Sequence, residues 1–309
     1  MFAQILVPTD LGVPSDAALE YARMFARTWD AALHVLHVTG ERVTPPRAGE
    51  PDGRRNIEPA ALRRIRERLT DGDQRHDVTI RLVERGAAAE VILDYARTAD
   101  IDLVVMGTHG RRGAAHFLLG SVAEAVVRGA PCPVLTTHAA TRPRESFSRI
   151  LVPTDFSSPS DAAFECARLL QLRFGASVHL LHVLEDALLE GPFGGEVFVA
   201  APAERRAARL RDARARLSHR VPTGGRESAR LTSEVVLGPA ADTIVHHAAD
   251  NGFDLIVMGT HGRTGLAHLL MGSVAERVVR GASCPVVTTR GERPCLVALG
   301  VRAEAAAAS

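Results

Sequence analysis

Apolar positions follow two alternating patterns along the chain. Short runs such as 5–7 and 103–106 are apolar at successive residues, which is typical of central parallel strands buried on both faces. Between the runs, apolar residues recur at helical spacing, as they do in 15–27. The first half of the chain therefore predicts strands and helices in this order: strand 3–8, helix 15–27, strand 32–38, helix 58–69, strand 78–83, helix 87–97, strand 101–106, helix 121–128 and strand 133–136. This alternation indicates an α/β fold with a parallel sheet, right-handed crossovers and helices on both faces.

The same pattern occurs twice. ILVPTD at 5–10 returns at 150–155, an offset of 145, and LHV at 36–38 returns at 181–183 with the same offset. The longest copy, 104–137, returns at 256–289 with an offset of 152 and differs at eight of its 34 positions. The offset grows by seven residues (152 − 145 = 7), which places an insertion in the second copy between 185 and 230. Insertions of this kind belong in loops and peripheral segments.

The repeat predicts two domains, each with an open five-stranded parallel sheet, and we take the strand order of each sheet to be 3-2-1-4-5. We expect domain 1 at 1–138, a linker at 139–147, domain 2 at 148–290 and a tail at 291–309. The segment 40–53, rich in proline and glycine, predicts a mobile loop. In the second copy, 187–226 contains a glycine-rich stretch and an arginine-rich helix, and Ser158 with Pro159 predicts a helix cap and first turn.

Composition narrows the class of protein. A length of 309 residues with 46% apolar content suits two ordinary cores, and a net charge of +1 argues against duplex DNA or an anionic membrane as partner. The four cysteines have neither CxxC spacing nor the density of a disulfide scaffold, so we expect a reducing compartment. The N-terminus lacks a signal-peptide pattern and no apolar run reaches membrane-spanning length. The sequence therefore predicts a soluble, cytoplasmic protein.

The long copies share a glycine-containing stretch between a strand and a helix. Each strand ends in MGTHG and each helix begins near GSVAE. Glycine permits positive φ and close approach of a ligand to the backbone, as a phosphate-binding loop requires. The S-x-x-E spacing predicts a capping box at the helix start, whose amides and dipole favour an anion. The residues concerned are Gly107, Gly110, Gly113, Gly120, Ser121 and Glu124, and in the second copy Gly259, Gly262, Gly265, Gly272, Ser273 and Glu276.

A second motif is expected to meet this stretch. In the order 3-2-1-4-5 the first and fourth strands are neighbours where the strand order reverses, which is where α/β sheets bind ligands. Thr9 and Asp10 then lie beside Gly107. Glycine amides suit phosphates, the Ser121 or Ser273 hydroxyl adds a donor, and the Asp10 or Asp155 carboxylate suits sugar hydroxyls. Basic side chains near the phosphates would be Arg111, Arg112 and Arg263.

Structural roles remain open for each of these residues taken alone. Asp10 also fits a loop cap, Ser121 a helix cap and the arginines a solvated surface. His109 and His261 lack the carboxylate, serine or cysteine partners of acid-base or nucleophilic chemistry, and a packing role in the loop is favoured for them. His246-His247 has no counterpart in the first copy and no metal-ligand spacing, so no metal site is predicted.

Two other nucleotide-binding motifs are missing from the sequence. There is no GxxxxGK[ST] and no GxGxxG after the first strand, which excludes a P-loop phosphotransferase and a classical dinucleotide-binding domain by motif.

The sequence resembles the universal stress protein family, in a tandem two-domain form. The family signature G-x2-G-x9-G-[ST] is met by Gly107, Gly110, Gly120 and Ser121 and again by Gly259, Gly262, Gly272 and Ser273, and VPTD, LHV and CPV-TT also match. The resemblance implies an adenine-nucleotide α-hydrolase-like fold that binds ATP, with or without Mg²⁺. It also implies that the two halves pair about a two-fold axis through their fifth strands, as an internal pseudo-dimer, with a homodimer as a further possibility.

The resemblance implies a role for each matching position. Asp10 and Asp155 would hold the ribose, the backbone at Val38 and Val183 would contact adenine, and the signature residues would hold the phosphates. The full expected site comprises Pro8, Thr9, Asp10, Val38, Gly107, Thr108, His109, Gly110, Arg111, Gly120, Ser121 and Val122, with Pro153, Thr154, Asp155, Val183, Gly259, Thr260, His261, Gly262, Arg263, Gly272, Ser273 and Val274 in the second copy.

The expected function is that of an ATP-binding stress-response protein that acts through nucleotide-dependent conformation or a protein partner. No base that would activate a nucleophile is evident, so no catalytic residue is predicted and ATP hydrolysis should be slow at most. Two alternatives stay open: a nucleotidyl- or phosphoryl-transferring hydrolase of the same fold, and an interaction scaffold with vestigial nucleotide sites.

Overall fold

The computed structural model describes residues 2–39, 57–69, 77–83, 86–108, 119–138, 141, 143–185, 188–190, 196–198, 203–221, 230–261 and 271–290. Two compact units are present, Met1–Ser146 and Phe147–Gly291. The predicted loop 40–53, the tail 291–309 and the middle of each glycine-containing stretch lie outside the described residues. Each unit is described by itself below.

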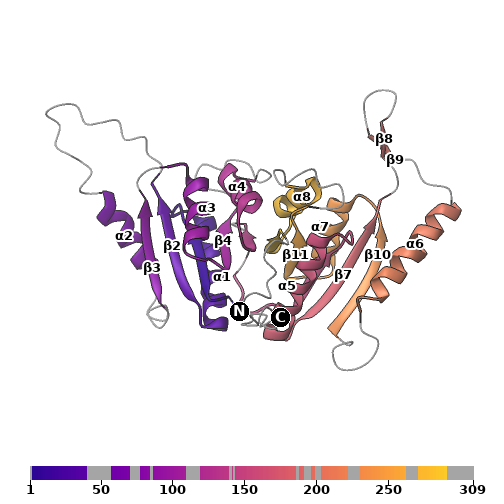
Figure 1. Ribbon diagram of the computed structural model, residues 1–309, viewed down its shortest axis with the longest axis horizontal. Helices are drawn as coiled ribbons and strands as arrows, with labels where there is room; N and C mark the ends of the chain where they lie inside the picture. Colours follow the sequence, from indigo (N-terminus) through magenta and orange to yellow (C-terminus); the bar gives the residue numbers. More distant parts are fainter. Residues whose placement is uncertain are drawn as a thin grey trace, which may run out of the picture. The chain divides into compact units, whose positions relative to one another are not determined.

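The first unit contains a five-stranded parallel sheet (Figure 1). Its order is β3-β2-β1-β4-β5, which confirms the predicted order 3-2-1-4-5. Ile5, Leu6 and Val7 of β1 are all fully buried. Since successive residues of a strand point to opposite faces, both faces of the sheet are covered. The strands are β1 Gln4–Pro8, β2 Ala32–Val38, β3 Val78–Val83, β4 Leu103–Gly107 and β5 Val134–Thr137.

In the described part of the first unit, the helices α1 to α4 lie between these strands in the sequence. The helix α1 packs along β1 and β4, α2 contacts β3, and α3 and α4 contact each other. A ring cluster of Phe2, Phe25 and Trp29 closes the end of α1 beside the start of β1. The helices are α1 Val13–Trp29, α2 Ile57–Arg68, α3 Ala88–Thr98 and α4 Ser121–Gly129.

The second unit repeats this arrangement. Its sheet has the order β10-β7-β6-β11-β12, again with all neighbours parallel. The strands are β6 Arg149–Pro153, β7 Ser177–Leu184, β10 Leu231–Leu237, β11 Leu255–Gly259 and β12 Val286–Thr289. The helices are α5 Ser158–Phe174, α6 Ala203–Ser218, α7 Ala240–Asp250 and α8 Ser273–Gly281.

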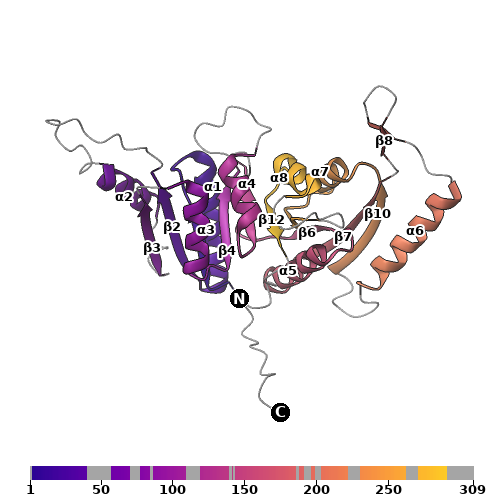
Figure 2. The same cartoon turned by 45° about the horizontal axis from the view of Figure 1, so that its top comes forward.

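The longer middle segment of the second unit holds an element that the sequence did not predict. The strands β8 Leu188–Glu190 and β9 Glu196–Phe198 form an antiparallel pair with Leu188 opposite Phe198. Strands of three residues are too short to show a period in the sequence. The arginine-rich helix that was predicted here is α6, which packs against β10 and β7 (Figure 2).

The predicted helix caps are wrong by one residue. The helices α4 and α8 have Gly120 and Gly272 as N-caps, without a side-chain cap hydrogen bond, so Ser121 and Ser273 are first helical residues and form no capping box. The reason is that Gly120 keeps an extended conformation (φ −63°, ψ 141°), and the first intrahelical bond runs from Glu124 N to Gly120 O. In α5 the N-cap is Ser157 rather than Ser158, although Pro159 does lie in the first turn.

Two further observations concern the class of protein. Among the residues that the structure describes, no helix combines the length and the apolar character needed to cross a membrane. Cys132, Cys166 and Cys284 are buried thiols. Cys132 and Cys284 lie just before β5 and β12, where a buried thiol packs as a small apolar side chain.

Candidate functional site

The carboxyl edges of the sheets bring the two sequence motifs together. In the first unit β1 pairs with β4, with Ile5 opposite Leu103, so both strands end at the same edge. The start of α1 packs directly on the end of β4, because a Cβ added to Gly107 would lie 2.7 Å from Pro14 Cβ. Gly259 and Pro159 repeat this contact at 2.9 Å in the second unit.

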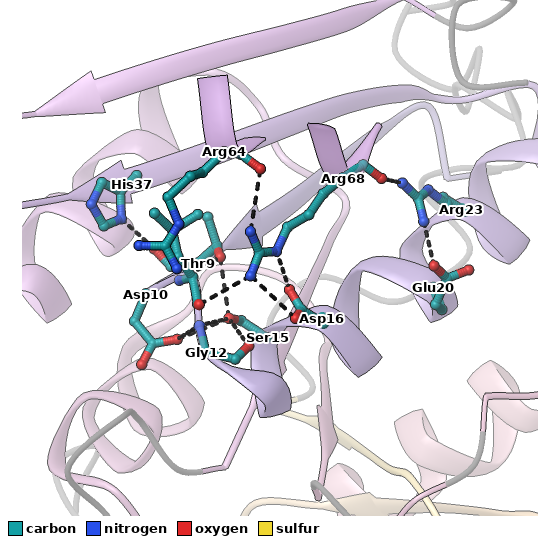
Figure 3. A network of polar contacts seen from close by, with 11 residues as sticks. Thr9, Asp10, Gly12, Ser15, Asp16, Glu20, Arg23, His37, Arg64 and Arg68 are labelled. Carbon is teal, nitrogen blue, oxygen red and sulfur yellow. Dashed lines mark hydrogen bonds and ion pairs between the residues drawn. The ribbon is translucent and has the colours of Figure 1, made fainter. Parts of the chain in front are cut away.

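The loop after β1 is held by hydrogen bonds from its own side chains (Figure 3). Asp10 Oδ1 accepts from the Gly12 amide at 2.9 Å, and Ser15 Oγ lies 2.8 Å from the same oxygen. Thr9 Oγ1 accepts from the Leu11 amide at 3.0 Å. Asp10 therefore does perform the loop-capping role that was left open for it, through one of its two oxygens.

The second unit builds the same loop with a different partner for the carboxylate. Asp155 Oδ1 accepts from Ser157 N at 3.1 Å and from Ser157 Oγ at 2.5 Å. Thr154 Oγ1 accepts from the Phe156 amide at 3.0 Å. In both loops the residue after the aspartate has positive φ, Leu11 at 62° and Phe156 at 65°. A left-handed conformation is costly for side chains of this size, so these hydrogen bonds and their surroundings must hold it.

Two histidines for which the sequence predicted no role fix these loops to the sheet. His37 Nδ1 lies 2.7 Å from Thr9 O, and His182 Nδ1 lies 2.7 Å from Thr154 O. A carbonyl only accepts, so each Nδ1 carries the proton and donates. Both histidines belong to the repeated LHV segment, and that repetition was the signal that could have identified them.

Arginines from the helix before the third strand of each sheet hold the loop from the other side. Arg68 of α2 donates from Nε to Asp16 Oδ1 at 2.5 Å and from Nη2 to Leu11 O at 3.2 Å. Arg220, just after α6, makes the matching bond from Nε to Asp161 Oδ1 at 3.2 Å. In each unit the region between the second and third strands thus contributes to the edge of the sheet.

A cavity of about 540 Å³ lies at this edge in the second unit. It contains two residues of the expected site, Asp155 and Val183, together with the side of α6 that carries Arg209 and Arg216. The Arg216 guanidinium lies 4.0 Å from the centre of the Phe156 ring, and Arg209 Nη2 donates to Glu185 O at 3.0 Å. The lining residues are Asp155, Phe156, His182, Val183, Leu184, Glu185, Ala208, Arg209, Asp212, Ala213 and Arg216. The volume is within the range of small-molecule sites.

The glycines in the described part of the glycine-containing stretch do not adopt the positive φ that the sequence led us to expect. Gly107, Gly120, Gly259 and Gly272 are not among the residues with positive φ. Gly107 and Gly259 are required instead by the proline contacts described above. The expectation that glycine supplies positive φ is therefore wrong at these four positions.

The ends of each stretch are tied together by their backbones. Gly120 N donates to Thr108 O at 2.8 Å, and Gly272 N donates to Thr260 O at 2.8 Å. These two glycine amides are already used, so an anion at the helix start would contact the following amides, which have no intrahelical acceptor. Ser121 and Ser273 are exposed there, with Val122 and Val274 partly exposed behind them.

Several expected site residues receive no structural description. His109, Gly110, Arg111, Arg112, Gly262 and Arg263 lie outside the described residues. His261 is described, and its Nδ1 lies 2.8 Å from Thr260 Oγ1, a contact within the chain segment itself. Pro8 and Pro153 end β1 and β6, and Val38 and Val183 lie near the ends of β2 and β7, at the same edges as the aspartates.

Comparisons with known proteins agree with this arrangement. A model of the universal stress protein family matches residues 1–138 and 146–290. A universal stress protein of Mycobacterium tuberculosis is 29% identical, with 93% of this chain and 96% of that protein covered. One from Methanocaldococcus jannaschii is 33% identical over 47% of this chain and 82% of its own length. The crystal structure of a universal stress protein from Archaeoglobus fulgidus has a similar fold, with a TM-score of 0.61, 21% identity, and 93% of this chain and 98% of that chain covered.

Proposed function

The chain belongs to the universal stress protein family, and from this premise we propose that each unit binds ATP at the carboxyl edge of its sheet. Nucleotide occupancy would then control conformation or the binding of a protein partner during a stress response. The proposed site is the full residue set expected from the sequence. We propose that the protein is located in the cytoplasm.

The cavity of the second unit carries this proposal. Its walls offer a carboxylate at Asp155 for ribose hydroxyls and the backbone at Val183 for the edge of adenine. The Asp155 carboxylate is oriented by Ser157, so its position is set before a ligand arrives. On the wall formed by α6, Arg209 and Arg216 outnumber Asp212, so this wall offers positive charge to an anionic ligand opposite the carboxylates of Asp155 and Glu185.

The phosphates would lie toward the starts of α4 and α8. The amides after Gly120 and Gly272 lack intrahelical acceptors, and a helix N-terminus favours negative charge. Ser121 and Ser273 are exposed beside those amides. We propose that these groups, with Arg111 and Arg263 from the glycine-containing stretches, hold the triphosphate, with or without Mg²⁺.

Binding without rapid turnover is supported by what the polar groups at this edge already do. His37 and His182 donate from Nδ1 to loop carbonyls, and Asp10 and Asp155 accept hydrogen bonds from their own loops. These interactions stabilise the loops, so the same groups are restrained as general bases. We therefore propose slow hydrolysis at most.

Isothermal titration of the purified chain with ATP tests the proposal. We expect binding, and we expect Asp155→Ala to weaken the second site by about tenfold or more, because hydrogen bonds to a charged group contribute about 1.5–3 kcal/mol each. Asp242→Ala is the matched control, since Asp242 is an exposed aspartate of α7 paired with Arg277. No binding by either unit at millimolar ATP would overturn the proposal.

A time course of ATP hydrolysis distinguishes the proposed ATP-binding protein from the enzyme alternative. Rapid, metal-dependent turnover that is lost in the double variant Asp10→Ala, Asp155→Ala would favour a hydrolase or transferase. The scaffold alternative predicts that Gly120→Val and Gly272→Val leave function intact.

A further inference from the structure

Three side chains of the second unit gather on the face of the sheet opposite the cavity. They are His179 of β7, Glu234 of β10 and His247 in the last turn of α7, and their ligand-type atoms all lie within 4.8 Å of one another. His179 and His182 are three positions apart on one strand, so their side chains point to opposite faces. His182 lines the cavity, and the three-residue cluster is therefore separate from the proposed ATP site.

Strand pairing explains why Glu234 belongs to the cluster. Thr232 lies directly opposite His179 in the parallel pair of β10 and β7. Glu234 comes two residues later and so points to the same face as Thr232. Its Oε2 lies 3.9 Å from His179 Nε2.

The His179 ring is oriented as a metal-binding histidine would be. Its Nδ1 lies 2.8 Å from Thr232 Oγ1, which can accept the Nδ1 proton. Its Nε2 is buried and has no hydrogen-bond partner among the described residues, and it faces the cluster. Histidine ligands commonly donate their second ring N–H to a neighbouring oxygen, which fixes the tautomer and leaves the other nitrogen for the metal.

Aromatic packing holds both imidazoles in place. The His179 and His247 rings stack at 5.3 Å with an interplanar angle of 18°, and Phe253 lies 5.6 Å and 5.7 Å from them. Burial lowers the pKa of His179, and His247 lowers it further, while Glu234 raises it. The neutral imidazole, which is the form that binds metals, is thereby favoured at neutral pH.

The first unit has a different set of side chains at the matching positions. His34 corresponds to His179 (179 − 145 = 34), but Tyr95 stands where the second unit has His247 (247 − 152 = 95). His34 uses both ring nitrogens, with Nδ1 2.8 Å from Tyr95 Oη and Nε2 2.6 Å from Gln4 Oε1. Arg81 takes the place of Glu234, two residues after the partner of His34 on β3. A histidine so bonded, beside an arginine, has no lone pair for a metal.

We propose that His179, Glu234 and His247 form a binding site for a divalent transition-metal ion of the Zn²⁺ class. Two imidazoles and one carboxylate are a ligand set that Zn²⁺ accepts, with a fourth position left for water or an exogenous ligand. In tetrahedral coordination with bonds of about 2.0–2.1 Å, ligand atoms lie about 3.3 Å apart, so the cluster must contract on binding. Glu234 is 53% exposed and can rotate inward to do so.

One neighbouring charge opposes the ion. The Arg149 guanidinium lies 5.1 Å from the centre of the Phe253 ring and is near enough to lower the pKa of His179. In the first unit the corresponding residue is the neutral Gln4 (149 − 145 = 4). Replacing Arg149 by glutamine should therefore strengthen metal binding, because a like charge is removed.

Titration of the full, chelator-treated chain with ZnCl₂, without ATP, tests this site. We expect one Zn²⁺ per chain at the cluster, and His247→Tyr, which introduces the residue of the first unit, should weaken that site by more than about a hundredfold. Loss of an orienting partner such as Thr232 in Thr232→Val should cost about 10–100-fold. Arg149→Gln should tighten binding severalfold.

His246→Tyr is the matched control, because His246 is the exposed neighbour of His247 on the same helix. It should bind Zn²⁺ like the unaltered chain. Equal Zn²⁺ affinity of His247→Tyr and the unaltered chain, or equal weakening by His246→Tyr, would overturn the proposal. Circular dichroism of each variant tests whether it is folded. The visible absorption spectrum of bound Co²⁺ gives a second readout that does not depend on the Zn²⁺ titration. It should be present in the unaltered chain and absent in His247→Tyr.

Discussion

The two units have similar polar contacts at the carboxyl edge of their sheets, but different side chains on the sheet face that α3 or α7 covers. At the carboxyl edge, Thr9 and Thr154 each accept a hydrogen bond at their carbonyl from a strand histidine. In each unit an arginine also binds the aspartate in the first turn of the following helix, Asp16 or Asp161. On the face covered by α3 or α7, His34 is fully hydrogen-bonded in the first unit whereas His179 in the second faces Glu234 and a second histidine.

This difference separates a part of the repeated unit whose geometry is the same in both copies from a part that differs between them. The loop geometry survives a change of partner, since Ser15 contacts Asp10 in one unit and Ser157 contacts Asp155 in the other. In both units a serine hydroxyl thus bonds the carboxylate, but the serine comes from a different position of the repeat. The opposite face has no such correspondence, and so it can carry a function in one unit alone.

The largest expected effect tests whether the two cores are equivalent. Ile5 and Ile150 are both fully buried at matching places in β1 and β6. Each change to alanine should reduce the free energy of unfolding of its own unit by about 2–5 kcal/mol, since it removes a buried side chain and leaves a cavity. Denaturant unfolding of the two variants measures this, and a loss below 1 kcal/mol in either would show that the units are not packed alike.

The glycine contact beneath the site gives the next largest effect. Gly107→Ala places a Cβ 2.7 Å from Pro14 and Gly259→Ala places one 2.9 Å from Pro159, both against backbone atoms as well. Overpacking of this kind costs about 1–3 kcal/mol, and the first unit should lose slightly more. Thermal unfolding of both variants would contradict this reading if neither melting temperature falls.

The differing faces should respond differently to loss of a polar group. Tyr95→Phe removes the hydroxyl bonded to His34 Nδ1 and should reduce stability by about 1 kcal/mol. Gln4→Ala, at the other ring nitrogen, should cost a similar amount. In metal-free protein, Thr232→Val is the corresponding change at His179. An unchanged free energy of unfolding in Tyr95→Phe would contradict a stabilising hydrogen bond between Tyr95 and His34.

Mild acid should reduce the free energy of unfolding of both units in the metal-free protein. Burial lowers the pKa of His34 and of His179 below the usual 6.5. Each neutral imidazole thus contributes stability that is complete above pH 6.5 and is lost as the pH falls from there toward the lowered pKa. His34→Gln and His179→Gln should each flatten this slope in unfolding experiments between pH 7 and pH 5, and an unchanged slope in both would contradict the assignment.

The order of elements was predictable because it depends on local patterns. Apolar runs and helical spacing located β1 to β5, and the strand order 3-2-1-4-5 was a hypothesis that the strand pairing of the first unit confirms. The cap positions were missed because Gly120, held extended by its bond to Thr108, ends the loop one residue earlier than Ser121 suggests. The pair β8 and β9 was missed because three-residue strands have no readable period.

The contacts between residues far apart in the chain could not be predicted from the sequence. Arg68 reaches Asp16 over 52 positions, and His247 meets His179 over 68 (247 − 179 = 68). No spacing rule connects such residues, and the adjacent pair His246-His247 has no metal-ligand spacing, so no metal site was predicted there. Only the fold assembles the cluster of His179, Glu234 and His247.

Native mass spectrometry of the full chain with ATP tests the central claim most directly, because it counts nucleotides on each molecule. At the lowest ATP concentration that fills both sites of the unaltered chain, two ATP molecules per chain are expected, with the occupancy of the second site reduced in Asp155→Ala, that of the first site in Asp10→Ala and both in the double variant. A chain that binds no ATP, or one whose count is unchanged in the double variant, would contradict the proposed sites at the carboxyl edges of the two sheets.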